Sequence, residues 1–139
     1  KINDSKEEGL KFVFGVSKIV APGMLIVASL LFVFAGPIVS ILLGDQYEGA
    51  IELLKIMAFI PFILAIGDIL SVQIMFNLGY QKEFTVFVTV AAILGMFLAI
   101  ILIYLYSSIG AAIALVSVEI FITLLLGKFL YFKRKKGLL

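Results

Sequence analysis

GDQYEGAIELLKIMAFIPFILAIGDILSVQIMFNLGYQKEF, residues 44–84, is the stretch of sequence that decides the fold. It is a long apolar run between two short polar turns, and it carries one carboxylate, Asp68, far from either turn. An Asp at the centre of a membrane-crossing helix costs roughly 2.5–3.5 kcal/mol on insertion. The stretch therefore predicts a transmembrane helix in which Asp68 is a candidate functional residue.

The rest of the chain is apolar in the same way. Of its 139 residues, 63% are hydrophobic and 14% are charged, and the mean hydropathy is +1.24, whereas about a quarter of the residues of a soluble domain are charged. A helix needs about 20 residues to cross the hydrocarbon core. The apolar blocks predict an all-α integral membrane fold in residues 18–132, with four transmembrane helices at about 18–43, 46–77, 84–104 and 109–132.

Glycine and proline mark the expected kinks and ends of these helices. Pro22, Pro37 and Pro61 lie inside apolar blocks and should bend the helices there, because proline cannot donate a backbone hydrogen bond. Gly44 should end the first helix, and Asp45-Gln46-Tyr47-Glu48 resembles a capping box that starts the second. Asn77-Leu78-Gly79 should end the second helix, and Ser107-Ser108 should cap the fourth.

The two flanks predict how the chain lies in the membrane. Residues 1–17 mix charged and apolar side chains, which indicates an amphipathic or interfacial N-terminal segment or a partly disordered terminus. Residues 133–139 form a basic tail. Ten of the eleven Lys and Arg lie near the termini or in the turn at 77–83, and only Lys55 lies on the other side. The positive-inside rule therefore predicts a multi-pass membrane protein with both termini of this segment cytoplasmic.

Composition also disfavours several functions. The chain has no Cys and no His, which removes thiol chemistry and the commonest general base and metal ligand. We expect no catalytic residue, metal site or cofactor, and hence no enzyme. The net charge of only +2 leaves no broad basic surface for a nucleic acid. Because the chain begins with Lys rather than Met, we expect a fragment of a longer protein.

Two acids lie within the predicted helices. Asp68 and Ser71 share a face of the second helix, and Glu119 and Thr123 share a face of the fourth. No Lys or Arg lies near the middle of an expected helix, where it could pair with either acid. One interpretation is that hydrogen bonds between helices satisfy both acids; the other is that they face a cavity and bind a cation, a proton or a substrate hydroxyl.

Three stretches together resemble a known family: residues 44–56, the turn Asn77-Leu78-Gly79-Tyr80-Gln81-Lys82-Glu83, and residues 109–119. They resemble the C-terminal part of bacterial polysaccharide (O-antigen-type) flippases of the multidrug/oligosaccharidyl-lipid/polysaccharide exporter superfamily. The resemblance covers about residues 15–133. It implies the last four helices of a two-lobed, twelve-helix transporter, which would flip lipid-linked oligosaccharide to the outer leaflet by alternating access.

The resemblance makes Asp68, Glu119, Ser71 and Thr123 transport-cavity candidates. The implied partners are the lipid-linked oligosaccharide, the remaining helices of the same transporter and the lipid bilayer. One alternative is a segment of a cation-coupled multidrug antiporter, in which the two acids would bind H⁺ or Na⁺. The other is a non-transporting four-helix membrane scaffold subunit.

Overall fold

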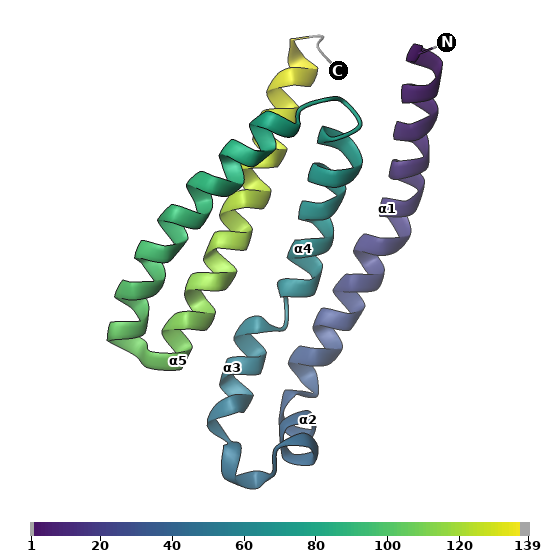
Figure 1. Ribbon diagram of the computed structural model, residues 1–139. Coiled ribbons are helices and arrows are strands. Elements are labelled where there is room, and N and C mark those ends of the chain that lie inside the picture. Colours follow the sequence, from purple (N-terminus) through teal and green to yellow (C-terminus); the bar gives the residue numbers. More distant parts are fainter. Residues whose placement is uncertain (1, 137–139) are drawn as a thin grey trace.

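The computed structural model describes the backbone of residues 2–136 and the side chains of that range except those of residues 2–11, 14 and 72. Every element in this part of the chain is helical (Figure 1). In chain order the elements are α1 (Ile2–Val33), α2 (Ala35–Leu42), the 3₁₀ turn η1 (Asp45–Tyr47), α3 (Gly49–Met57), α4 (Ile60–Asp68), the π-helix η2 (Ile69–Met75) and α5 (Gln81–Lys135).

The two predicted flanking segments are continuous with helices where the structure describes them. The segment predicted at 1–17 is part of α1 from Ile2 onward, and Lys1 lies outside the described residues. The basic tail predicted at 133–139 begins as the last turn of α5, and residues 137–139 lie outside the described part of the chain.

The first helix breaks ahead of Pro37. Helix α1 continues through Pro22 but ends at Val33, and Phe34 leaves helical geometry with φ −94° and ψ 14° before α2 starts. Pro37 has no N–H to donate to the Val33 carbonyl four residues earlier, so one backbone hydrogen bond of the helix is missing at this point. The predicted break at Gly36-Pro37 is confirmed.

A second break lies beside the first. Helix α3 ends at Met57, and α4 starts at Ile60 with Pro61 in its first turn. Pro61 cannot donate to the Met57 carbonyl, which confirms the predicted bend. The rings of Phe32 and Phe59 have centroids 5.9 Å apart, so the two breaks are neighbours in space.

The turn between α2 and α3 follows the prediction only in part. Gly44 follows Leu43, the C-cap of α2, and has φ 92°, a left-handed conformation that favours glycine, as expected. The capping box predicted for Asp45–Glu48 is wrong. Because Asp45–Tyr47 wind into a 3₁₀ turn, Glu48 becomes the residue that precedes α3, and no side chain caps either element.

The second predicted helix does not end as an α-helix. After Asp68 the chain widens into the π-helix Ile69–Met75, and the Phe76 N–H donates to the carbonyl of Ser71, five residues back, at 3.0 Å. Gly79 then closes the turn with φ 84°. Hydropathy gave no sign of this π-helix.

Helix α5 folds back on itself at Ser107, whose φ of 54° and ψ of −131° are not helical. Figure 1 shows the two halves running side by side in opposite directions. We call residues 81–106 the first arm and residues 108–135 the second arm; they correspond to the helices expected at 84–104 and 109–132. Gly110 lies so close to the first arm that a Cβ there would overlap the carbonyl of Leu102.

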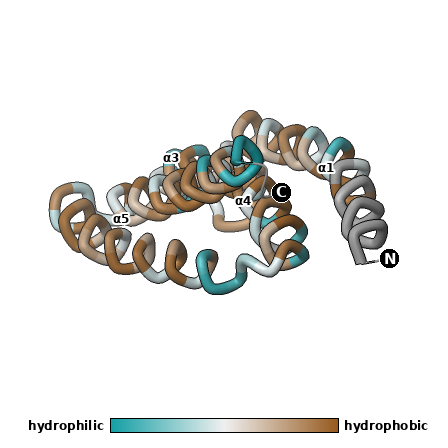
Figure 2. The backbone as a smooth tube through the Cα atoms, turned by 90° about the horizontal axis from the view of Figure 1, so that it is seen from above, coloured by the Kyte–Doolittle hydropathy of each residue, from teal (hydrophilic) through white to brown (hydrophobic). Residues whose placement is uncertain are grey.

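Apolar side chains lie on the outside of the fold as well as inside. Three helical segments of the described residues are long and apolar enough to cross a membrane, Gly15–Val33, Gly49–Met75 and Gln81–Lys135. In Figure 2 hydrophobic residues extend around the helices, and hydrophilic residues are confined to short stretches. Exposed apolar area on this scale is typical of a surface that meets lipid or other helices.

The interior is small and gathers where α1, η2 and α5 meet. Met75 and Leu126 are the largest fully buried side chains among the described residues. They form a cluster with Val13, Ile69, Ile74 and Leu130. This cluster holds η2 against the second arm of α5, and so fixes the position of Asp68, which directly precedes Ile69.

Candidate functional site

Asp68 stands where the α-helix α4 passes into the π-helix η2. Its side chain is exposed on a groove of about 350 Å³ between α1 and α4. Among the described residues, no hydrogen bond reaches the Asp68 carboxylate. Its oxygens therefore remain able to accept hydrogen bonds from a ligand or to bind a cation. The groove is lined by Val20, Met24, Pro61, Leu64, Ala65, Asp68, Ile69 and Gln73.

Gln73 is a polar residue of this groove that sequence reasoning missed. Five residues separate it from Asp68, and at 3.6 residues per turn that spacing puts two side chains on different faces of a helix. In a π-helix, residues i and i+5 are bonded neighbours along the axis. Because residues 69–75 form a π-helix, Asp68 and Gln73 line the same groove. Only the helix type could have revealed this pairing.

Glu119 lies on the second arm of α5 and is half-buried. It lines a groove of about 370 Å³ between the two arms. Apart from Glu119, all the side chains that line this groove are apolar or are glycine: Ala92, Gly95, Met96, Ala99, Ala111, Ala114, Leu115 and Val118. The two acids therefore open onto different grooves.

The structure nevertheless brings the two acids near each other. Asp68 directly follows Gly67 and Glu119 lies one turn before Thr123, so the two acids flank the place where α4 meets the second arm. The approach depends on Gly67, where an added Cβ would lie 3.3 Å from Oγ1 of Thr123. Small residues allow helix backbones to approach closely in this way. Helix α4 and the second arm thus meet with a carboxylate on each side of the contact.

The two hydroxyl candidates are both shielded from solvent at least in part. Ser71 is buried, and its hydroxyl donates to the backbone carbonyl of Asp68 at 3.5 Å rather than to the Asp68 carboxylate. Thr123 is half-buried against Gly67. The structure therefore places Thr123 at the contact with Gly67 and buries Ser71 within η2, and neither hydroxyl satisfies the Asp68 side chain.

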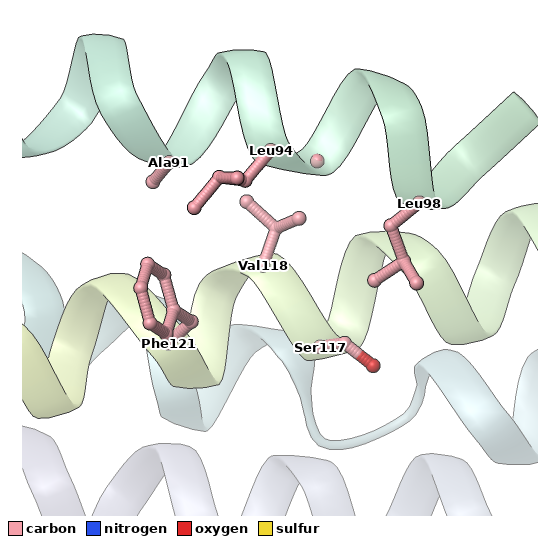
Figure 3. Close-up of a pocket in the computed structure, with 7 residues that line it drawn as sticks. Ala91, Leu94, Leu98, Ser117, Val118 and Phe121 are labelled. Carbon is pink, nitrogen blue, oxygen red and sulfur yellow. The ribbon is translucent and has the colours of Figure 1, made fainter.

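A second groove between the arms of α5 is apolar. Figure 3 shows Val118 of the second arm pointing toward the helix that carries Ala91, Leu94 and Leu98. Ser117, at its edge, donates its hydroxyl to the carbonyl of Ile113 at 2.7 Å and so is already satisfied. This groove is a packing surface without a free polar group for a ligand.

Among the side chains that the structure describes, no group of three His, Cys, Asp or Glu lies close enough to hold a metal ion. The chemistry available at the site is hydrogen bonding and charge: two carboxylates, one amide and two hydroxyls. Helices without strands, three spans of membrane-crossing length and acids within the helix contacts define an all-α membrane protein.

Comparison with known proteins narrows this class. Over 110 residues the chain is 33% identical to a protein of Escherichia coli (strain K12) described as a "Putative O-antigen transporter". The matched region covers 79% of this chain and 26% of that protein. The chain therefore spans about a quarter of the length of this relative. No model of a known protein family matches the chain, and no solved structure matches it. The similarity supports a membrane protein of the polysaccharide-transporter type.

Proposed function

We propose that the chain is part of a membrane transporter that flips lipid-linked oligosaccharide from the cytoplasmic to the outer leaflet by alternating access. The observation that carries the proposal is the 33% identity to the O-antigen transporter over most of this chain. The protein would lie in the bacterial inner membrane with both termini of this segment cytoplasmic. Its partners would be the lipid-linked oligosaccharide, the bilayer and the other helices of the same transporter.

The polar groups of the α1–α4 groove give this proposal a chemical basis. A sugar presents hydroxyl groups, which donate to carboxylates and accept from amides. Asp68 and Gln73 offer that acceptor and that donor on a groove whose other lining residues are apolar. Hydrogen bonds to a charged acceptor contribute about 1.5–3 kcal/mol each. Asp68 is therefore the residue of this segment that we expect to contribute most to substrate binding, followed by Glu119, with Ser71 and Thr123 positioning the helix contact.

The test is complementation of a strain that lacks the gene by the full-length protein. Asp68→Asn and Glu119→Gln keep the size of each side chain and remove its charge. We expect surface polysaccharide to fall roughly tenfold or more for Asp68→Asn, because a charge-assisted hydrogen bond is lost. Glu52→Gln is the matched control, since Glu52 is an exposed acid of α3 that lines neither the α1–α4 groove nor the groove between the arms.

Two results would contradict different parts of the proposal. Normal surface polysaccharide in the strain without the gene would overturn the transport function. Normal polysaccharide with Asp68→Asn and Glu119→Gln, at wild-type protein level by immunoblot, would overturn the site and leave the transport function standing.

A cation-coupled antiporter is a second candidate, favoured by the two acids that flank the contact between α4 and the second arm. A carboxylate inside a membrane-spanning segment can bind a proton or Na⁺, which offsets the cost of its charge. Transport measured in proteoliposomes with and without a Na⁺ or H⁺ gradient distinguishes the two functions. The antiporter requires the gradient and expels drug-like cations, and the double variant Asp68→Asn/Glu119→Gln would abolish its coupling.

A further inference from the structure

The last turn of α5 concentrates positive charge at one end of the fold. Lys133, Arg134 and Lys135 form that turn and Lys136 follows it. Arg134, Lys135 and Lys136 are exposed. Within the described part of the chain, no acidic side chain pairs with any of the three. Their charge is therefore not neutralised by an ion pair within these residues.

Lys133 differs from its neighbours because aromatic rings hold it. Its Nζ lies 4.8 Å from the centroid of the Tyr80 ring and 5.4 Å from that of Phe129. The two rings also contact each other edge to face, with centroids 5.4 Å apart. A cation within about 6 Å of a ring centroid is attracted to the ring. These contacts tie the end of α5 to the turn before its first arm, so the three cations that follow have a defined place.

The charged turn lies directly beyond an aromatic boundary. Tyr131 and Phe132 precede it, and their side chains are 66% and 49% exposed. Aromatic residues gather at the level of the lipid headgroups, at the edge of the hydrocarbon core. Lys82, also exposed, lies at the same end of the fold, in the first turn of α5 (Figure 1). The cations are therefore placed at the depth of the phosphate groups.

We propose that the end of α5 is a binding site for anionic phospholipid, in which Arg134, Lys135 and Lys136 bind the headgroup phosphate and the exposed ring of Tyr131 lies against the lipid. Charge complementarity selects the ligand, because basic clusters next to a transmembrane helix attract anionic headgroups. Lys133 is a positioning residue through its contacts with Tyr80 and Phe129. This site lies at the opposite end of η2 from Asp68 and does not depend on the transport function.

Native mass spectrometry of the full-length protein in detergent tests the proposal. The protein is titrated with phosphatidylglycerol and, separately, with zwitterionic phosphatidylcholine. Each near-surface cation contributes about fivefold to binding of an anionic membrane. We therefore expect the triple variant Arg134→Gln/Lys135→Gln/Lys136→Gln to bind phosphatidylglycerol roughly a hundredfold more weakly. The charge-preserving variant Arg134→Lys/Lys135→Arg/Lys136→Arg should bind like the wild type.

The wild-type protein alone supplies a second measurement, which does not depend on how well the variants fold. Binding of phosphatidylglycerol should weaken as salt rises, because salt screens exposed charges. Equal binding of phosphatidylcholine and phosphatidylglycerol would overturn the proposal. Displacement of the lipid by inorganic phosphate at constant ionic strength would also overturn it, because the site would then bind free anions rather than a lipid surface. Unchanged binding by the triple Gln variant would overturn the assignment to these three residues.

Discussion

The second arm of α5 makes two helix contacts, and at each contact a glycine of the partner helix allows the close approach. The two contacts differ in the side chains around them. Against the first arm it packs Val118 onto Gly95, and the groove beside that contact is apolar. Against α4 it packs Thr123 onto Gly67, with Asp68 and Glu119 at the edges. The first contact is the tighter one, because a Cβ at Gly95 would press on Val118 harder than a Cβ at Gly67 would press on Thr123.

The difference shows what small residues do in each place. Between the arms they allow apolar surfaces to close, which favours a fixed hairpin. Between α4 and the second arm they bring two acids close to the contact, and an ionisable residue inside a membrane-spanning segment is costly. A contact that holds such residues is a better candidate for function than a contact that only packs. The predictions below test this contrast, beginning with the largest effect.

Gly110→Ala should cause the largest loss of stability. The new Cβ would meet the backbone carbonyl of Leu102, which cannot move aside without opening the hairpin at Ser107. We expect a loss of about 3 kcal/mol or more, the upper range for an overpacked site, seen as a lower melting temperature in detergent. Gly36→Ala is the control, because a Cβ there meets nothing within 4 Å. Equal melting temperatures for the two variants would show that the arms are not so close.

Gly95→Ala should cost about 2 kcal/mol, because the obstacle is the Val118 side chain, and a side chain yields more easily than backbone. Adding Val118→Ala should restore most of that loss, since it removes the atoms in conflict. The double-mutant cycle measures this coupling directly. Additive losses from the two substitutions would contradict the contact.

Gly67→Ala should cost less than about 1 kcal/mol, because Thr123 needs to move by only a few tenths of an ångström. Surface polysaccharide should nevertheless fall more than it does for Gly95→Ala when protein levels are matched. If the two contacts do differ in purpose, stability and export will rank these two variants in opposite orders. If Gly67→Ala and Gly95→Ala ranked in the same order for stability and for export, the two contacts would not differ in purpose.

Asp68→Asn should produce the smallest change in stability, and of opposite sign. An uncharged amide costs less than a carboxylate inside a membrane-spanning segment, so the melting temperature should rise slightly while export falls. Glu52→Gln should change neither quantity appreciably. A lower melting temperature for Asp68→Asn would indicate that the carboxylate is a structural partner after all.

Much of the fold could be predicted because proline and glycine act locally. Pro37 and Pro61 remove hydrogen-bond donors wherever they occur, and Gly44 follows the end of α2 with the positive φ that glycine permits. The break at Ser107 was also expected from its position between two apolar blocks. The capping box at Asp45 failed because a local motif cannot tell a 3₁₀ turn from the first turn of an α-helix.

The site was less accessible to sequence reasoning. Asp68 and Glu119 could be named, because a charge inside an apolar block is visible in any sequence. Their approach depends on how α4 and the second arm align, which is set by packing between segments far apart in the chain. Gln73 was missed because its place beside Asp68 requires a π-helix, and the apolar pattern of residues 69–75 does not distinguish a π-helix from an α-helix.

The two neighbouring proline breaks have a mechanical consequence. A helix bends most readily where an i→i−4 bond is missing, and here two such points are adjacent, with the rings of Phe32 and Phe59 between them. Ala35 and Ala58 are buried at these points, so little bulk resists a change of angle. The corner formed by α2, η1 and α3 can therefore change its angle at these two breaks without loss of hydrogen bonds within its own helices. Because α3 also packs against α5 near Ser107, such a tilt would be felt at the hairpin between the two arms.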